Sequence, residues 1–419
     1  MTHPQPVRKR KVFYLPGYDP VPARHYREMY RREGAAQAEI SGYALHMQAK
    51  QGAGYTWQVE AEIDGMETVT EVEFLAWNDI VVASMQAGIL ASYWLLLRTL
   101  WLYLRTGALV SLIRLRPAPM IAALYPVVLL GGQLLLAIAA GFLVGWGIRY
   151  ALVYMALPFI EGWPLLQVAY LGIALALLSA VAGIVVFGLA LKAFKARDNR
   201  IYAYYLLYVY AFSAWHAGGY PPALRTRMQD FKARIAKALT ENNDEVLIVG
   251  HSVGAHLGVE LLAEMERDGM INGNTPLALL SLGEVIPMIS YLPAARGLRR
   301  SLHRLGKSAR VFWLDVTAPG DGGCFALCDP VAVSGVGTGP KVLSAAFSQT
   351  LKPDTYAARK RSFFKLHFQY LCAFDQPGIY DYFAITAGPK TLEARFGAQP
   401  DSPSKRVQCF SKYTDMADD

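Results

Sequence analysis

The sequence predicts an α/β fold, in which a mostly parallel sheet has helices on both faces and is interrupted by a two-helix transmembrane hairpin. Short apolar runs alternate with helix-compatible segments in the second half of the chain, which is typical of parallel strands joined by crossover helices. Two uncharged apolar runs, at about residues 120–147 and 164–191, interrupt this pattern. Each of them is long enough to cross a bilayer.

The first soluble part, residues 1–79, carries the start of the predicted sheet. An apolar strand is expected at residues 12–15 and an arginine-rich helix at residues 23–32. Two alternating segments follow within residues 55–74, and an Asp-Gly dipeptide at residues 64–65 joins them. Asp-Gly between alternating segments is a strong β-hairpin signal, so we expect a hairpin here.

Residues 80–217 are predicted to be a membrane insertion. Arg98 interrupts the apolar pattern of residues 80–101, which favours an amphipathic helix in the membrane interface over a span. The two long runs then cross the bilayer, and a tyrosine-rich segment at residues 201–215 leads back out of it. The alternative of two helices buried in a large soluble core is weaker, because both runs are long and uncharged.

Positive charges flank the two predicted spans on their outer sides. These cations are Arg105, Arg114 and Arg116 before the first span, and Lys192, Lys195, Arg197 and Arg200 after the second. Because cytoplasmic flanks are enriched in Lys and Arg, both termini and both soluble parts are expected in the cytoplasm. The chain is therefore predicted to be a two-span protein of the cell membrane, with the lipid bilayer as its partner.

The main soluble domain is expected over residues 218–390. A charged amphipathic helix at residues 224–239 precedes its strands. Strand candidates follow at residues 245–250, 277–282 and 309–315, with a weaker one at residues 342–347. Residues 391–419 form a polar tail, and no fixed structure is expected from residue 399 onward.

The composition excludes several functional classes. The chain is 53% hydrophobic and 18% charged, and its net charge of +8 is scattered rather than clustered with aromatic residues, which argues against nucleic-acid binding. The four cysteines lack the paired spacing of a zinc site and are expected to be buried or reduced thiols. These cysteines are Cys324, Cys328, Cys372 and Cys409. We predict no cofactor and no metal, and the sequence indicates no particular oligomeric state.

A strand candidate runs directly into Gly-His-Ser-Val-Gly at residues 250–254, and a helix-compatible segment follows. This order is what a nucleophile elbow needs, because Ser252 occupies a sharp strand-to-helix turn and Gly250 and Gly254 let the backbone pass closely. The N-terminus of the following helix also favours developing negative charge. At these residues the chain resembles the α/β-hydrolase family, in particular its lipases and esterases.

The resemblance covers two blocks, residues 12–79 and 218–390, on either side of the membrane insertion. It implies an α/β-hydrolase-like sheet and a nucleophilic serine that is activated by a histidine, which a carboxylate orients in turn. In the family the chain order of these groups is serine, acid, histidine.

Three histidines follow Ser252 and could act as its base. His256 lies one turn into the following helix, behind the serine, and His303 lies in a basic stretch typical of a solvated helix face. His367 comes after the last strand candidate. Its position and the family order make His367 the expected base.

Three aspartates are candidates for the acid. Asp315 and Asp321 both lie near the end of one strand candidate. The acid of the family usually lies in the loop just beyond this strand, which favours Asp321 and keeps Asp315 as the alternative. Asp329 precedes a proline, and Asp-Pro is more often a turn.

Two backbone N–H groups are expected to bind the oxyanion. One belongs to Val253, the residue after the nucleophile. The other is assigned to Tyr18, because Pro-Gly-Tyr at residues 16–18 resembles the His-Gly-x loop of the family, with proline in place of histidine. A plain Pro-Gly turn is the alternative interpretation.

The resemblance implies a membrane-anchored carboxylic ester hydrolase that works through an acyl-enzyme. Its substrate is expected to be a lipid or another hydrophobic acyl ester. This expectation follows by association from the location of the enzyme at the bilayer. Two other functions stay open: a catalytically inactive hydrolase-fold scaffold or binding protein of the membrane, and an acyltransferase or thioesterase that uses the same serine.

Overall fold

The structure is a computed structural model that describes residues 6–49, 55–271 and 273–417. The chain divides into two compact units. The sheet unit comprises residues 1–85, 100–122 and 212–419, and the hairpin unit comprises residues 86–99 and 123–211.

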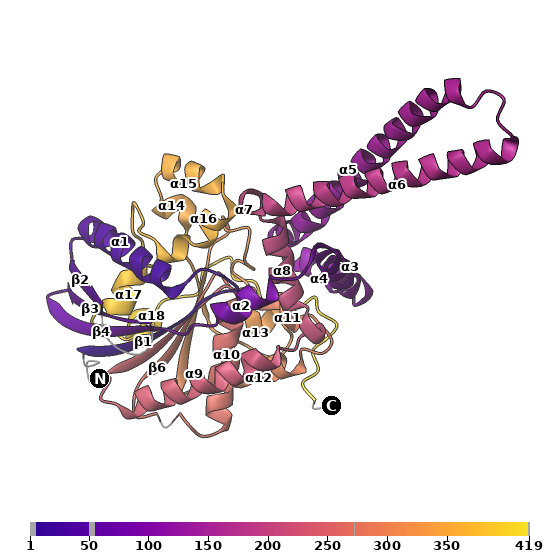
Figure 1. The fold of residues 1–419 in the computed structure, drawn as a ribbon. Coiled ribbons are helices and arrows are strands. Elements are labelled where there is room, and N and C mark those ends of the chain that lie inside the picture. Colours follow the sequence, from indigo (N-terminus) through magenta and orange to yellow (C-terminus); the bar gives the residue numbers. More distant parts are fainter. Residues whose placement is uncertain (1–5, 50–54, 272, 418–419) are drawn as a thin grey trace. The chain divides into compact units, whose positions relative to one another are not determined.

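Eight strands of the described residues form one sheet, in the order β2-β3-β4-β1-β5-β6-β7-β8 (Figure 1). β3 is antiparallel to β2 and β4, and every other neighbouring pair is parallel. The strands are β1 (Lys9–Leu15), β2 (Ala44–Ala49), β3 (Tyr55–Ile63), β4 (Met66–Phe74), β5 (Glu245–His251), β6 (Leu277–Leu282), β7 (Val311–Thr317) and β8 (Lys341–Ser344). The predicted α/β class with a mostly parallel sheet is confirmed.

Helices connect and cover the strands. Those of the first half are α1 (Ala23–Ser41), α2 (Asn78–Ser84), α3 (Ile89–Arg105), α4 (Ala108–Leu115), α5 (Pro117–Ala156), α6 (Leu165–Ala196), α7 (Asp198–Ile201) and α8 (Ala203–Ser213). Those of the second half are α9 (Pro222–Thr240), α10 (Val253–Arg267), α11 (Pro287–Ser290), α12 (Arg296–Gly306), α13 (Pro330–Val333), α14 (Phe347–Thr350), α15 (Pro353–Lys360), α16 (Phe363–His367), α17 (Tyr382–Ala387) and α18 (Leu392–Phe396).

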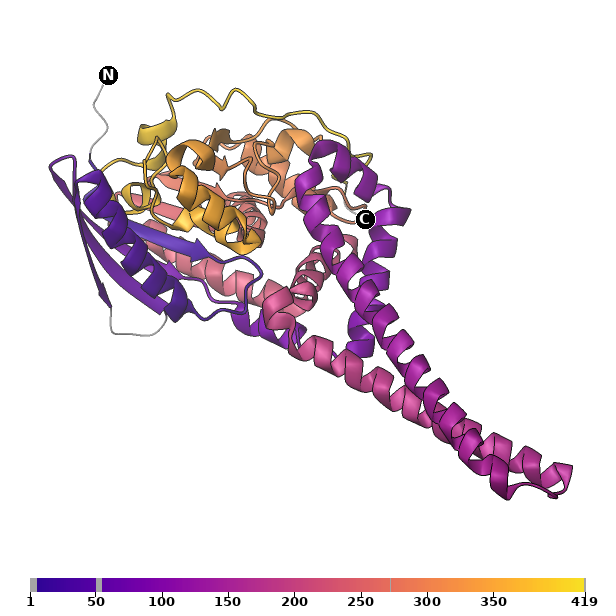
Figure 2. The same cartoon turned by 90° about the horizontal axis from the view of Figure 1, so that it is seen from above.

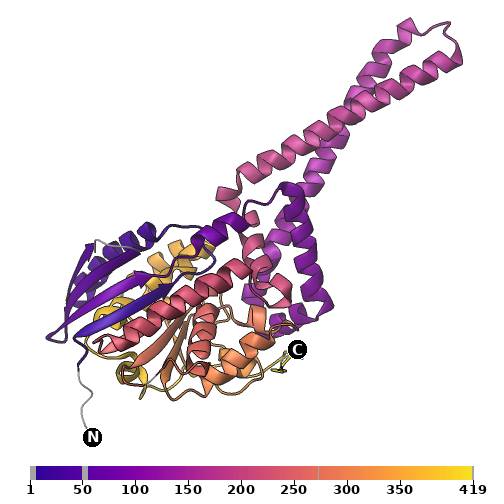
Figure 3. The same ribbon diagram turned by 60° about the horizontal axis from the view of Figure 1, so that its bottom comes forward.

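The central strands β5 and β6 are buried along their whole length, because helices cover both faces of the sheet. Val249 shares a buried cluster with Tyr30 of α1 on one face, together with residues of α14, α16, α17 and α18 (Figure 2). On the other face Ile248 and Leu279 lie against Gly258 of α10, and α9 and α12 lie on this side (Figure 3). The carboxyl ends of β1, β5, β6 and β7 share one edge, where loops of distant sequence positions meet.

The sequence located most strands of this sheet. The Asp-Gly turn joins β3 and β4 as expected, and both of its residues have positive φ, 56° at Asp64 and 71° at Gly65. β2 was not predicted. It lies at the edge of the sheet, alternates between half-buried and exposed positions, and lacks the β-branched residues that mark a buried strand.

Two helices of the described residues are long and apolar enough to cross a membrane. They cover Pro117–Phe159 and Leu165–Ala196, with mean hydropathy 2.4 and 2.6. α5 and α6 pack closely, since a Cβ at Gly141 would lie 2.6 Å from the carbonyl oxygen of Gly183. Only glycine allows the two backbones this approach.

α2 and α3 are long and apolar enough for a membrane span only when taken together, and they are bent by 102°. The described residues therefore hold two possible spans, or three if the bent pair is one span. α3 exposes an apolar stripe formed by Leu90, Trp94, Leu97, Trp101 and Leu104. Their spacing of three or four residues puts them on one face of the helix, as in interfacial helices. The interfacial role expected for residues 80–101 stays a prediction.

The expectation that the chain lacks fixed structure from residue 399 is wrong for residues 399–417. The Arg406 N–H donates to Leu327 O at 2.7 Å, and the Asp329 N–H donates to Arg406 O at 2.8 Å. The Ser402 N–H donates to Val342 O at 2.9 Å, beside β8. Polar composition alone led to the wrong prediction, because backbone hydrogen bonds to the folded domain can order a polar segment.

Candidate active site

Ser252 lies at a strained turn between β5 and α10. Its φ of 55° and ψ of −119° are rare for a residue with a Cβ and match the strain expected of a nucleophile elbow. Steric crowding requires glycine at both flanking positions. A Cβ at Gly254 would lie 2.2 Å from Leu15 O, and one at Gly250 would lie 2.7 Å from Gly254 O. β5, the turn and α10 thus adopt the strand–elbow–helix geometry that the motif predicts.

The loop after β1 lies against the Ser252 side chain. A Cβ at Gly17 would lie 3.1 Å from Ser252 Cβ and 3.6 Å from Ser252 Oγ. Val253 is the first residue of α10, so its N–H has no acceptor within the helix. The Tyr18 side chain is buried against Trp77, with ring centroids 6.0 Å apart, which anchors the loop. Val253 thus follows the serine in the chain, and Tyr18 follows the glycine that lies against the serine.

His367 and Asp321 form a hydrogen bond at the same sheet edge. The distance from His367 Nδ1 to Asp321 Oδ2 is 2.9 Å. Asp321 belongs to the loop after β7, and His367 ends α16. Because Nδ1 donates to the carboxylate, the lone pair of the neutral imidazole lies on Nε2. A Cβ at Gly283, after β6, would lie 3.4 Å from Asp321 Oδ2 and from His367 Cε1. Both side chains therefore pack against this glycine.

The Asp321 carboxylate has donors on both oxygens. Oδ1 accepts from the Gly323 N–H at 2.8 Å, and Oδ2 accepts from the Tyr370 hydroxyl at 3.0 Å in addition to His367. Burial alone would raise the pKa of Asp321, but the charge and hydrogen bond of His367 and the Gly323 N–H outweigh it and lower that pKa. The carboxylate is therefore ionised at neutral pH.

Tyr370 supports Asp321 and was missed by sequence reasoning. Its hydroxyl accepts from the Ala318 N–H at 3.0 Å and donates to Asp321. Burial raises the pKa of Tyr370 well above its ordinary value, so the hydroxyl keeps its proton and remains a donor. The available signal was a tyrosine three residues after the expected base, and this spacing alone carries little weight.

His251, the residue before the nucleophile, was also missed. Its Nε2 lies 2.9 Å from the main-chain oxygen of His367, and the two rings are 4.9 Å apart. Since a carbonyl only accepts, Nε2 carries the proton and donates. Burial, and then the charge of His367, lower the pKa of His251 to about 3, so the ring stays neutral.

The other acid candidates have different partners. Asp315 Oδ1 accepts from Ser281 Oγ at 2.5 Å. Asp329 caps α13, where its Oδ1 accepts from the Val331 and Ala332 N–H groups at 3.0 Å. The structure thus brings Asp321, and not these two, onto His367.

The other histidine candidates also lie apart from this contact. His256 is fully buried in α10 and stacks on Tyr220, with ring centroids 5.7 Å apart and the planes 3° apart. His303 lies half-buried on α12, with Nδ1 2.6 Å from Val336 O. The solvated face expected for His303 is therefore only partly right.

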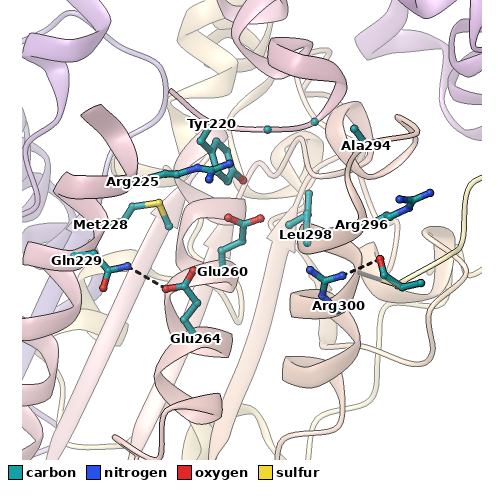
Figure 4. Close-up of a pocket in the computed structure, with 14 residues that line it drawn as sticks. Tyr220, Arg225, Met228, Gln229, Glu260, Glu264, Ala294, Arg296, Leu298 and Arg300 are labelled. Carbon is teal, nitrogen blue, oxygen red and sulfur yellow. Dashed lines mark hydrogen bonds between the residues drawn. The ribbon is translucent and has the colours of Figure 1, made fainter. Parts of the chain in front are cut away.

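A polar cavity of about 400 Å³ lies between α9, α10 and α12 (Figure 4). Its charged lining residues are Arg225, Glu260, Glu264, Arg296 and Arg300. Most of these charges already have partners: Gln229 Nε2 donates to Glu264, Arg296 pairs with Asp415, and Arg300 donates to the carbonyl oxygens of Met416 and Ala417. Glu260 is eight residues beyond Ser252 on α10, about 12 Å along the helix axis, so the cavity is separate from the serine.

No group of three or more His, Cys, Asp or Glu side chains among the described residues could hold a metal ion. Cys324, Cys328 and Cys372 are buried thiols, and Cys409 is a half-buried one.

No protein-family model, curated protein or solved structure matches this chain.

Proposed function

We propose that the protein is a membrane-anchored serine hydrolase that cleaves a carboxylic ester through Ser252, His367 and Asp321. The observation that carries the proposal is the hydrogen bond of 2.9 Å between His367 and Asp321, at the sheet edge where Ser252 occupies its strained elbow. A base with an orienting carboxylate, at the same sheet edge as a half-buried serine, is the arrangement that acyl transfer requires. Ser252 is half-buried rather than enclosed.

In this mechanism Ser252 Oγ attacks the ester carbonyl while His367 Nε2 takes the hydroxyl proton. The Asp321 carboxylate stabilises the imidazolium that forms. The N–H groups of Val253 and Tyr18 donate to the tetrahedral oxyanion. The proton then passes to the leaving alcohol, and a water molecule, activated by the same histidine, releases the acyl group.

We further propose that the sheet unit is an α/β-hydrolase fold. The chain order serine, aspartate, histidine agrees with that family, as does an elbow after a central strand. The neighbouring strand β1 pairs with β5 in parallel register, Leu15 beside Gly250, so the loop after β1 ends beside the elbow. This is the position from which the family's second oxyanion donor comes.

The membrane part of the proposal rests on α5, α6 and their charged flanks. We propose that the two spans hold the protein in the cell membrane, with both termini and the catalytic unit in the cytoplasm, because cations flank the spans on their outer sides. A hydrolase held there meets substrates that live in the bilayer. The proposed substrate is therefore a lipid or another hydrophobic acyl ester.

The test is labelling of the full-length protein, in detergent or nanodiscs, with a fluorophosphonate probe that reacts with activated serines. Wild type is expected to be labelled, Ser252→Ala is not, and Ser301→Ala on α12 is labelled like wild type. If wild type stays unlabelled while a known serine hydrolase in the same sample reacts, the protein is an inactive scaffold. Labelling with acyl transfer to an acceptor other than water indicates an acyltransferase.

A further inference from the structure

Two buried carboxyl groups lie beside the candidate active site without taking part in it. Asp315 is the fifth residue of β7, and Glu284 follows β6 by two residues. Both are 0% exposed. β6 and β7 are neighbours with Ser281 opposite Asp315, so the two acids lie at the carboxyl ends of adjacent strands.

Each of these carboxyl groups has one oxygen with a donor and one without. Asp315 Oδ1 accepts from Ser281 Oγ, which accepts in turn from Trp313 Nε1 at 2.9 Å. Glu284 Oε2 accepts from the Ile286 N–H at 2.6 Å. Asp315 Oδ2 and Glu284 Oε1 are buried and have no hydrogen-bond partner among the described residues.

The surrounding charges do not neutralise the two acids. Asp329 is the third buried acid of this cluster, and its ion pair with Lys405 Nζ, at 3.2 Å, occupies the nearby lysine. Lys405 also pairs with Asp401 at 3.3 Å. Neither Glu284 nor Asp315 has an ion pair among the described residues. The cluster also borders the thiols of Cys324 and Cys328. Asp321 and Tyr370 lie near Cys324, and Arg116 and Arg406 lie near Cys328.

Burying two ionised carboxylates close together without counter-charges is unfavourable in free energy. Protonation of one of them removes much of this penalty. Burial, and then the charge of Asp315, raise the pKa of Glu284. Burial, and then the charge of Asp329, raise the pKa of Asp315 and outweigh the hydrogen bond of Ser281 and the charge of Lys405, which lower it. A protonated carboxyl also has an O–H that can donate, whereas an ionised one can only accept.

The pair is connected to the loop that carries Asp321. The Glu284 main-chain oxygen accepts from the Phe325 N–H at 3.1 Å. Thr317, two residues after Asp315, accepts through Oγ1 from the Leu327 N–H at 2.8 Å. Asp321 and His367 pack against Gly283, which directly precedes Glu284. Repulsion between the two acids would therefore act on this loop at residues 325 and 327 and, through Gly283, at Asp321.

We propose that Glu284 and Asp315 hold a proton between them and that this protonated pair positions the loop of Asp321. Loss of the proton at alkaline pH loosens the loop, so the triad misaligns although His367 remains able to accept a proton. The effect on activity rests on the proposed function, whereas proton uptake by the pair does not.

Stability against pH tests the pair without any assay of activity. The acids are ionised in the unfolded chain but protonated in the folded one, so wild-type stability is highest in acid and falls as the pH rises through the folded-state pKa values. Thermal unfolding of the full-length protein is measured in detergent from about pH 5 to about pH 9. Glu284→Gln should show a shallower fall than wild type, and Glu241→Gln, an exposed control, should follow wild type.

Labelling of Ser252 by the fluorophosphonate probe tests the positioning role. The wild-type rate is expected to fall about tenfold between about pH 7 and about pH 9, as a misplaced catalytic group would cause. Glu284→Gln, whose amide can donate to Asp315, should lose much less over the same range. Asp315→Asn is the second variant if Glu284→Gln does not fold.

The possible outcomes distinguish failure of the protonated pair from failure of the proposed hydrolase function. If both variants match wild type in the pH dependence of unfolding, the pair holds no extra proton and the inference is wrong. If unfolding changes as expected but the alkaline loss of labelling does not, the pair is protonated without positioning the loop. If no protein is labelled at any pH while unfolding responds, the proposed function fails and the protonated pair stands.

Discussion

His251 donates its Nε2–H to the main-chain oxygen of His367 over 2.9 Å, so the residue before the nucleophile holds the backbone of the candidate base. This contact joins the end of β5 to the end of α16, which are 116 residues apart in the chain. Because the ring of His251 is neutral, it holds His367 without placing a second positive charge beside the imidazolium.

Replacement of His251 should separate a positioning role from simple packing. His251→Leu removes the donor and leaves the His367 oxygen unpaired, so the rate of Ser252 labelling should fall by about tenfold to 100-fold. His251→Gln keeps an N–H at a similar reach and should recover most of that rate. Equal losses in both variants would show that the hydrogen bond does not matter.

The two aspartates at the end of β7 should differ sharply. Asp321→Asn removes the charge that orients His367 and stabilises its protonated form, so the labelling rate should fall by about 10³-fold or more. Asp315→Asn touches neither His367 nor Asp321 and should cost far less at neutral pH. Rates are measured with the probe on folded protein. Equal residual rates would remove both residues from the triad.

Tyr370→Phe tests the second donor to Asp321. The change removes one hydrogen bond to a buried carboxylate, and such bonds contribute about 1.5–3 kcal/mol. The rate constant for hydrolysis of a soluble ester should fall about tenfold or more, with little change in KM, because the ring packing stays. A change in KM alone would mean that Tyr370 shapes the substrate site instead.

The elbow glycines should tolerate no side chain. A Cβ at Gly254 would lie 2.2 Å from Leu15 O, and this oxygen belongs to the backbone of a buried strand, so it cannot move freely. Gly254→Ala is expected to lower the free energy of unfolding by about 3 kcal/mol or more and to abolish labelling. Gly297→Ala, where a Cβ meets nothing within 4 Å, is the matched control. Unfolding in denaturant measures both.

The sequence was most informative where local pattern and geometry coincide. G-x-S-x-G after an apolar run located the elbow, because the turn leaves no room for a side chain at its two glycines. The uncharged apolar runs located α5 and α6. It was least informative about contacts over long distances. Nothing around Asp321 in the sequence reveals that Tyr370 donates to it, and nothing around residue 406 reveals the hydrogen bonds that order the tail.

The α5–α6 contact should depend on its glycines. A Cβ at Gly183 would lie 2.7 Å from Gly141 O, so Gly183→Leu forces the two helices apart and removes their close backbone packing. We expect a lower midpoint of thermal unfolding for the hairpin in nanodiscs, followed by tryptophan fluorescence of Trp146. Gly188→Leu, on the same helix but with nothing within 4 Å of a Cβ, should leave the midpoint near that of wild type. Similar losses in the two variants would mean that bulk alone, and not this contact, destabilises the hairpin.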